Sequence, residues 1–321
     1  MADFLTPEQI TCRTVAALDA AVGAGRDLGL TVTDASVLYD LFSVVVHLAP
    51  APVVARIPVV LPHGEPDAVP RRQRAELDVT TWLAERGVPV LKPSPLVPSE
   101  PVRREGFSMT FWELAEEDKS REPDYAANSE LVAGLHAALR DYPGPLSFLS
   151  AAEPRAVTDS LAQLAHRPEL LDPADLDRAV REWRILEPYV RSRELFEQAF
   201  PGIDIQPVHG DSPPANIFYG VDGDRYSDFE LITLGPVEWD LAGLGPDLEA
   251  AYDRGALGHG LRPLDKDVLG FVNAVGMLRA VATLALAPQL PVLVDYLKPA
   301  VEQWRSLPFA GGMAAAGQEY L

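Results

Sequence analysis

Strand-like and helical sequence are segregated along this chain of 321 residues. Segments rich in β-branched residues cluster in the first third, at about 31–39, 43–49, 52–60, 95–98 and 106–112. Helical periodicity within that third is limited to 7–28 and 70–86. Helical patterns then dominate, at about 122–141, 151–166, 174–199, 237–254, 264–286 and 289–306. Strands that precede a run of helices, instead of alternating with them, predict an α+β fold with the sheet at one end.

The excess of acidic residues limits the kinds of molecule that the protein can bind. Asp and Glu number 47 against 27 Lys and Arg, which gives a formal net charge of −20. This charge repels a phosphodiester backbone and an anionic lipid surface. We therefore expect neither nucleic-acid binding nor docking on a membrane. The 47% hydrophobic content is enough for a sizeable core and excludes a disordered chain.

The sequence shows no export signal. Residues 1–10 lack a basic stretch followed by an apolar one, and Cys12 is the single cysteine. We therefore expect a reducing, cytoplasmic location. The apolar stretch at 44–62 has the length of a membrane span. Its four prolines would interrupt a helix repeatedly, so it predicts two short strands instead.

One polar segment, 205–236, interrupts the helical second half of the chain. Asp211 and Asn216 are five residues apart in its predicted loop, and Asp228 follows a hairpin with a predicted turn at 222–224. This spacing is that of the kinase catalytic loop, H-R-D-x-x-x-x-N. Phosphoryl transfer needs a carboxylate that orients the attacking hydroxyl and accepts its proton, and oxygen ligands for magnesium. The segment therefore predicts a phosphoryl-transfer site.

The run VHGDSPPANIFYG followed by YSDFELITLGPVEWDLAGL resembles the aminoglycoside phosphotransferase-like small-molecule kinases. The matching positions are His209, Gly210, Asp211, Asn216, Asp228, Glu230, Gly235, Asp240, Leu241 and Ala242. The resemblance implies a two-lobed, protein-kinase-like α+β fold with the nucleotide between the lobes. Its N-lobe would be 1–110, with a leading helix, an antiparallel sheet and one further helix. Its helical C-lobe would be 111–321, with a catalytic loop at 209–216 and a metal-binding hairpin at 217–230.

The resemblance also implies a role for each polar residue of the second half. Asp211 would be the catalytic base. Mg²⁺ would be bound by Asn216 and Asp228, with Glu230 as a second metal ligand or an acceptor contact. The remaining two residues, His209 and Asp240, would support the catalytic loop structurally.

In the first third, the resemblance points to four nucleotide-binding residues. Arg56 stands where the family usually has a phosphate-binding lysine, and Glu76 would be its ion-pair partner. Ser43 lies in the turn between the first two strands, where its hydroxyl would bond a phosphate oxygen. Glu113 lies in the hinge-like segment TFWEL and would contact the nucleotide.

Three departures from the family pattern keep alternatives open. Arginine replaces the lysine at 56, the turn at 40–43 has no glycine, and the loop interior at 212–215 holds two prolines. We expect a Mg²⁺-dependent kinase that transfers the γ-phosphate of ATP or GTP to a hydroxyl of an aminoglycoside-, sugar- or macrolide-like acceptor. The departures leave room for a catalytically weak nucleotide-binding protein, and the acceptor could instead be choline or another amino alcohol. The oligomeric state stays open.

Simpler interpretations of single residues also stay open. The polar loop residues could be ordinary turn residues. Arg56 could be a solvent-facing strand residue, and Glu76 a solvated helix residue. For His136, on the apolar face of LHAAL, we expect a buried core histidine without a catalytic role.

Overall fold

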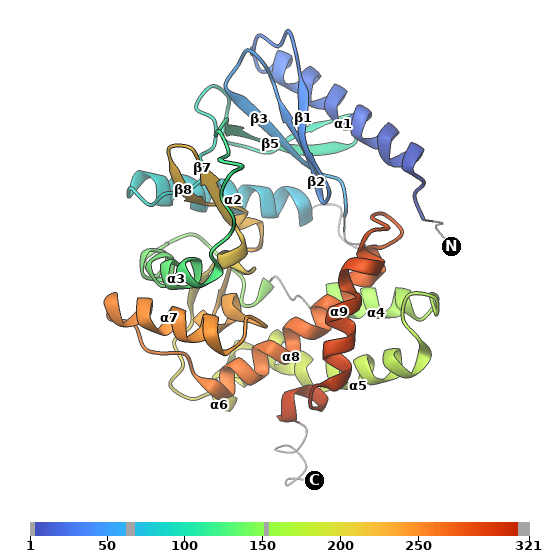
Figure 1. Ribbon diagram of the computed structural model, residues 1–321, viewed down its shortest axis with the longest axis vertical. Coiled ribbons are helices and arrows are strands. Elements are labelled where there is room, and N and C mark those ends of the chain that lie inside the picture. The colour runs from blue at the N-terminus through green and yellow to red at the C-terminus, as the bar shows by residue number, and fades with distance from the viewer. Residues whose placement is uncertain (1–3, 62–67, 151–153, 314–321) are drawn as a thin grey trace. The chain divides into compact units, whose positions relative to one another are not determined.

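The computed structural model describes residues 4–61, 68–150 and 154–313 (Figure 1). The chain divides into two compact units. Unit 1 comprises Met1–Glu122, Asn216–Glu230 and Pro288–Pro291, and unit 2 comprises Pro123–Ala215, Leu231–Ala287 and Val292–Leu321. This division differs from the predicted lobes, because it falls after Glu122 and because Asn216–Glu230 groups with the first unit. The predicted lobe boundary at 110 stays a prediction.

Unit 1 is built on a five-stranded antiparallel sheet with the strand order β1-β2-β3-β5-β4. Its strands are β1 (Ser36–Asp40), β2 (Ser43–His47), β3 (Val53–Pro58), β4 (Val102–Arg104) and β5 (Phe107–Glu113). The central strands β2 and β3 bury most of their valines, and the edge strand β1 is exposed throughout. The strand predicted at 95–98 is wrong: its prolines lack the N–H groups that a ladder needs, and β4 begins at Val102.

Two helices accompany this sheet. Helix α1 (Pro7–Asp27) begins as predicted, with Thr6 as its N-cap in a reciprocal capping box with Gln9 and a proline in the first turn. Helix α2 (Ala68–Glu85) buries Glu76 together with apolar neighbours such as Leu77 and Leu83. The buried face of α2 therefore carries a carboxylate into the interior of unit 1.

A two-stranded hairpin, β7 (Ile217–Gly220) and β8 (Gly223–Tyr226), belongs to the same unit. Its turn is Val221–Asp222, one residue earlier than predicted. Backbone hydrogen bonds attach it to the preceding part of unit 1: Leu91 N donates to Tyr226 O, and Asp118 N donates to Tyr219 O. These bonds explain why the hairpin groups with the sheet and not with the helices.

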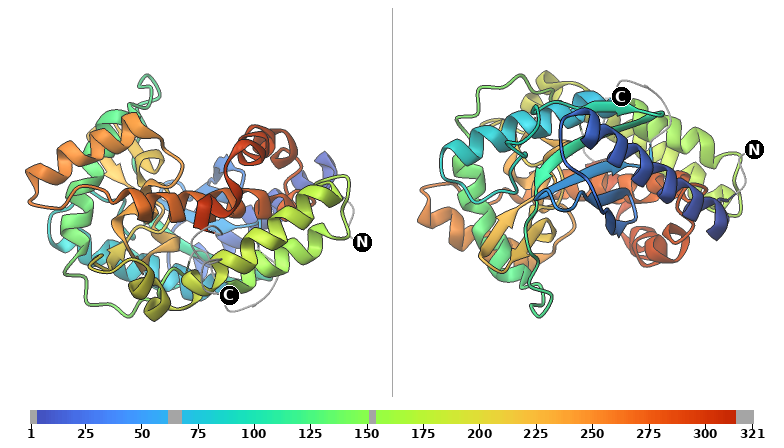
Figure 2. Two further views of the ribbon diagram at one scale, coloured as in Figure 1. Left: turned by 90° about the horizontal axis from the view of Figure 1, so that it is seen from below. Right: turned by 90° about the horizontal axis from the view of Figure 1, so that it is seen from above.

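Unit 2 is mainly helical. Its helices are α3 (Tyr125–Leu139), α4 (Pro154–Leu164), α5 (Pro173–Arg191), α6 (Arg193–Ala199), α7 (Pro246–Gly258), α8 (Lys266–Thr283) and α9 (Leu293–Ser306). Helices α3 and α7 lie side by side (Figure 2) and share a core cluster that includes Val132 and Tyr252. The predicted helix 174–199 is divided at Ser192, which caps α6, and the predicted helix 237–254 is broken at the positive-φ glycines 243 and 245.

A short antiparallel pair, β6 (Gln206–Val208) and β9 (Thr233–Gly235), brackets the polar segment within unit 2. Among the described residues, one helical stretch, Lys266–Leu286, is long and apolar enough to cross a bilayer by length and composition. Its most apolar window is 56% buried inside the protein, so its length and composition are weak evidence for a membrane span.

Candidate active site

The loop that carries Asp211 begins directly after β6 and makes a turn that only glycine tolerates. Gly210 has φ +90°, and a Cβ at this position would lie 1.7 Å from the backbone oxygen of Leu231. A side chain is therefore excluded by both backbone strain and overlap. This is the physical reason for the glycine that precedes Asp211.

Asp240 holds the backbone of this loop from a fully buried position in unit 2. Its Oδ2 accepts from His209 N at 2.8 Å, and its Oδ1 accepts from Gly210 N at 2.8 Å. Hydrogen bonds from backbone N–H groups to a buried carboxylate are among the stronger ones in proteins. Asp240 thus lies where a loop-supporting residue is needed, while His209 contributes its backbone N–H.

His136 completes this cluster and is the buried core histidine that we expected. It is 0% exposed, with Nε2 2.9 Å from Asp240 Oδ2 and Nδ1 2.9 Å from the hydroxyl of Tyr252. Burial, together with the charges of Glu238 and Asp240, raises the pKa of Tyr252, so its hydroxyl stays protonated and can donate to Nδ1. With the tyrosine hydroxyl as donor to Nδ1, the proton on the ring lies at Nε2 and is donated to Asp240.

The prolines in the loop interior are part of a packed turn. Pro213 and Pro214 are buried in a single turn of 3₁₀ helix, and Asn128 Nδ2 donates to Pro214 O at 2.8 Å. Asp211, by contrast, is exposed. The loop backbone is therefore held by buried contacts, while the carboxylate of Asp211 stays accessible.

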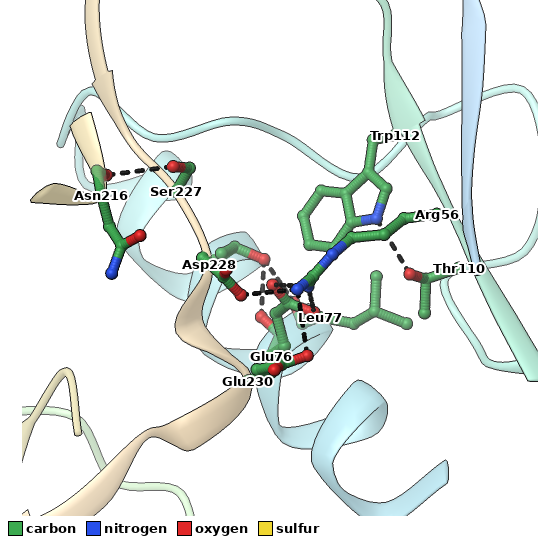
Figure 3. A network of polar contacts seen from close by, with 10 residues as sticks. Arg56, Glu76, Leu77, Thr110, Trp112, Asn216, Ser227, Asp228 and Glu230 are labelled. Carbon is green, nitrogen blue, oxygen red and sulfur yellow. Dashed lines mark hydrogen bonds and ion pairs between the residues drawn. The ribbon is translucent and has the colours of Figure 1, made fainter. Parts of the chain in front are cut away.

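The ends of the β7–β8 hairpin are tied together in unit 1. Ser227 donates to the backbone oxygen of Asn216 through both its N–H and its hydroxyl, each at 3.0 Å (Figure 3). Asn216 precedes β7 and Asp228 follows Ser227, so both lie at the open end of the hairpin. Asp228 has φ +64°, a left-handed conformation that is uncommon outside glycine and that recurs at functional sites.

Arg56 lies at the centre of a cluster of three carboxylates within unit 1 (Figure 3). Its Nη1 donates to both carboxylate oxygens of Glu76, each at 3.0 Å. Its Nη2 donates to Asp228 Oδ1 at 2.7 Å and to Glu230 Oε2 at 3.0 Å. The solvent-facing alternatives for Arg56 and Glu76 are therefore wrong, since Glu76 is only 2% exposed and both groups are paired.

The electrostatics of this cluster follow from burial and crowding. Burial opposes the charge of the Arg56 guanidinium, but the carboxylates of Glu76, Glu230 and Asp228 outweigh it and raise the pKa of Arg56. Burial raises the pKa of Glu76 to about 8 against the opposing effect of Arg56, and Asp228 and Glu230 add to the rise. Arg56 thus stays charged, and Glu76 takes up a proton more readily than an ordinary glutamate does.

The remaining predicted residues have clear positions. Ser43 begins β2 and is 6% exposed, directly after the glycine-free turn. Glu113 ends β5 with an exposed side chain. It lines a cavity of about 450 Å³ within unit 1, together with Lys92, Glu116 and Arg225. The nucleotide contacts predicted for Ser43 and Glu113 stay predictions.

The donor set suits a hard divalent cation. Asp228 and Glu230 converge on one nitrogen of Arg56, so a positive group already lies within hydrogen-bonding distance of both. Asn216 adds an amide side chain at the same end of the hairpin (Figure 3). Oxygen ligands from carboxylates and amides are those that Mg²⁺ prefers. Within the described residues, no group of three or more His, Cys, Asp or Glu side chains could hold a metal ion, so a site at this place would need ligands besides these two carboxylates.

Sequence reasoning missed several residues that hold these groups in place. Nothing in the local pattern marks Asn128, Ser227 or Tyr252, because each acts on a segment that the sequence does not place next to it. It also missed the contacts of Arg56 with Asp228 and Glu230, which lie 172 and 174 residues away. The one available signal was the arginine itself, whose planar fork can bind two partners at once.

Comparison with known proteins bears on the family and the fold of this chain. The sequence model of the phosphotransferase enzyme family, APH, matches residues 44–264. No curated protein sequence matches the chain. Among solved structures, a microcompartment-associated aminopropanol kinase is similar with a TM-score of 0.59 at 14% identity, over 92% of this chain and 97% of that one.

Two further structures have the same fold. The choline kinase LicA from Streptococcus pneumoniae gives a TM-score of 0.56 at 14% identity, over 91% of this chain and 99% of that one. The aminoglycoside phosphotransferase APH(3'')-Id from Streptomyces rimosus, in complex with ADP and streptomycin, gives 0.52 at 19% identity, over 86% and 97%. The predicted α+β, protein-kinase-like fold is confirmed.

Proposed function

Because the chain belongs to the phosphotransferase enzyme family, we propose that it transfers the γ-phosphate of ATP or GTP to a hydroxyl of an aminoglycoside-, sugar- or macrolide-like acceptor, with Mg²⁺. The observation that carries this proposal is the convergence of Asp228 and Glu230 on Arg56, beside Asn216 at the open end of the hairpin. Carboxylate oxygens next to a cationic group are what a metal-bound triphosphate requires. The single cysteine is in keeping with a cytoplasmic location.

Asp211 would act on the acceptor. The acceptor oxygen forms a bond to the γ-phosphorus as the bond from phosphorus to the bridging oxygen of the nucleotide breaks. The hydroxyl proton passes to Asp211, and the nucleoside diphosphate leaves. The backbone that precedes Asp211 is held by Asp240 and by the glycine turn, so its carboxylate can be aimed without reorganisation of the loop.

The residues of unit 1 would act on the nucleotide. Mg²⁺ held by Asn216, Asp228 and Glu230 would neutralise negative charge on the phosphates. Arg56 would contribute a further positive charge, and Glu76 would fix the position of its guanidinium through two hydrogen bonds. Ser43 and Glu113 would contact the nucleotide from the first two strands and from the end of β5.

The acceptor class follows from charge and from chemistry shared within the family. A net charge of −20 favours cationic acceptors over anionic ones, because the field of the whole protein attracts them. Aminoglycosides meet this requirement, and so do choline and other amino alcohols. An amino-alcohol kinase is therefore the second candidate function, with the same phosphoryl-transfer step and a smaller acceptor.

A screen of nucleotide consumption tests the proposal. The protein would be incubated with ATP or GTP and Mg²⁺ against aminoglycosides, sugars, macrolides and amino alcohols, with D211N as the matched control. We expect acceptor-dependent consumption that falls by about 10² to 10⁴ in D211N, the loss typical of one positioned general base. Nucleotide affinity should stay within a few-fold in that variant.

Two outcomes would contradict the proposal. Equal turnover by wild type and D211N would exclude Asp211 as the base. Tight nucleotide binding without transfer to any acceptor would favour the catalytically weak nucleotide-binding protein.

A further inference from the structure

Arg56 makes two separate sets of contacts through the two arms of its guanidinium (Figure 3). One arm, Nη1, is bound by both oxygens of Glu76. The other arm, Nη2, is shared by Asp228 and Glu230. The same nitrogen therefore occupies the point on which both proposed metal-ligand carboxylates converge.

The two arms lie in different surroundings. The Glu76 side chain is 3% exposed, whereas the side chains of Asp228 and Glu230 are 37% and 34% exposed. Water and solute ions therefore reach the Nη2 end of the cluster much more easily than the Nη1 end. An ion pair of two buried groups is costly to break by removing one partner, whereas exposed ion pairs contribute little. The Glu76 contact is therefore the harder one to break, and the contacts with Asp228 and Glu230 are the easier ones to replace.

The charge of the cluster leaves room for an incoming cation. One guanidinium is hydrogen-bonded to three carboxyl groups, so at least one negative charge is left over when Asp228 and Glu230 are ionised, whether or not Glu76 carries a proton. A lysine at position 56 would present its N–H groups from one nitrogen, so it could not reach Glu76 and the Asp228–Glu230 pair through two separate arms. The arginine fork instead satisfies Glu76 and reaches the other two carboxylates at the same time.

We propose that Arg56 is an internal cation that competes with the divalent metal for Asp228 and Glu230, and that it must release these carboxylates before the metal binds. The inference rests on the proposed function, because it takes Asp228 and Glu230 as metal ligands. Glu76 acts as the fixed pivot that holds Nη1 while Nη2 is released. Arg56 is then a positioning residue that sets metal affinity, in addition to its role toward the nucleotide.

A consequence is coupling between the nucleotide and the metal. Phosphate oxygens are alternative partners for the released Nη2, and arginine binds phosphate as readily as carboxylate. A bound nucleotide would therefore draw Arg56 away from Asp228 and Glu230 and favour metal binding. Linkage requires the converse as well: bound metal raises the affinity for nucleotide.

Mn²⁺ binding to the nucleotide-free protein, followed by electron paramagnetic resonance, tests the competition without any turnover. We compare wild type with R56K, which keeps one positive charge for Glu76 but loses the second arm. We expect R56K to bind Mn²⁺ about tenfold more tightly, from the loss of two partly exposed charge-assisted bonds. The matched control is R121K, which makes the same change at an exposed arginine paired with Asp224 in unit 1. It should bind Mn²⁺ as wild type does.

A second variant allows the same test if R56K fails to fold. The double variant R56Q/E76Q replaces the pivot pair by two amides, leaves the formal net charge of the chain unchanged and removes the guanidinium from Asp228 and Glu230. It should bind Mn²⁺ at least as tightly as R56K. If a variant that melts like the wild type also binds Mn²⁺ with wild-type affinity, the proposed competition is wrong.

D228N separates this inference from the function on which it rests. Loss of Mn²⁺ binding in D228N, with unchanged affinity in R56K, would refute the competition and leave the metal site intact. Unchanged Mn²⁺ binding in D228N would overturn the ligand assignment itself, and the competition with it.

Discussion

Replacement of Asp240 by asparagine should loosen the loop that carries Asp211. The carboxylate of Asp240 accepts three hydrogen bonds, two at Oδ2 from His209 N and His136 Nε2 and one at Oδ1 from Gly210 N. An asparagine amide has one accepting oxygen and one donating nitrogen. The amide nitrogen of the new side chain therefore faces a group that also donates, and no hydrogen bond forms between them.

The structure shows which of these bonds can adapt. His136 can move its proton to Nδ1, because the Tyr252 hydroxyl on that side can accept as well as donate. The backbone N–H groups of His209 and Gly210 cannot change, so D240N leaves one of them without an acceptor in either orientation of the amide. A buried unpaired N–H costs about 1–3 kcal/mol. The remaining hydrogen bonds also become weaker, because their acceptor is no longer a charged carboxylate. We expect a total loss of about 2–4 kcal/mol in the free energy of unfolding.

Thermal unfolding and turnover measure this effect. We expect D240N to lower the Tm by about 3–6 °C, because an unfolding entropy of ~2.1 cal/mol/K per residue gives about 1.5 °C per kcal/mol for a chain of 321 residues. It should also lower kcat, because Asp211 follows directly on the released backbone. The control D159N removes an exposed carboxylate from an i,i+4 ion pair with Arg155 and should change the Tm by about 1 °C or less. A D240N protein that melts within 1 °C of wild type would refute this account of the loop.

Three further predictions concern the other parts of the site. ATP should raise the Tm much more with Mg²⁺ present than with EDTA, and D228N should abolish most of that difference. Equal rises in Tm for the wild type under both conditions would contradict the proposed metal site. G210A should destabilise the fold by about 2–5 kcal/mol, because a Cβ would overlap Leu231 O at a φ of +90°; a Tm within 2 °C of wild type would contradict this. The pKa of Glu76 is raised to about 8 in its buried position beside Arg56, Asp228 and Glu230. The contribution of this group to the free energy of unfolding is therefore complete below pH 4.5 and declines as the pH rises toward 8. E76Q should therefore show a flatter Tm profile between these values than wild type, and an unchanged slope would exclude Glu76 as its source.

Much of the chemistry could be predicted from the sequence, because it depends on residue types at short, fixed separations. Asp211 and Asn216 are joined by a loop too short to rearrange freely, and Asp228 follows after one hairpin. The start of α1 was predictable for a similar reason, since a capping residue and a proline act on their own neighbours. Local signals therefore determined the class of reaction and most of the candidate ligands.

Tertiary structure decided which of these groups face one another. No local pattern shows that Nη2 of Arg56 is shared by Asp228 and Glu230, because those partners lie more than 170 residues away. The buried face of α2 was equally hidden, since Glu76 is polar and its burial becomes tolerable only through Arg56. The three bonds to Asp240 depend on α3 and on the loop after β6 meeting in one core. Burial and long-range pairing belong to the folded chain as a whole, so they arise only once distant segments have packed together.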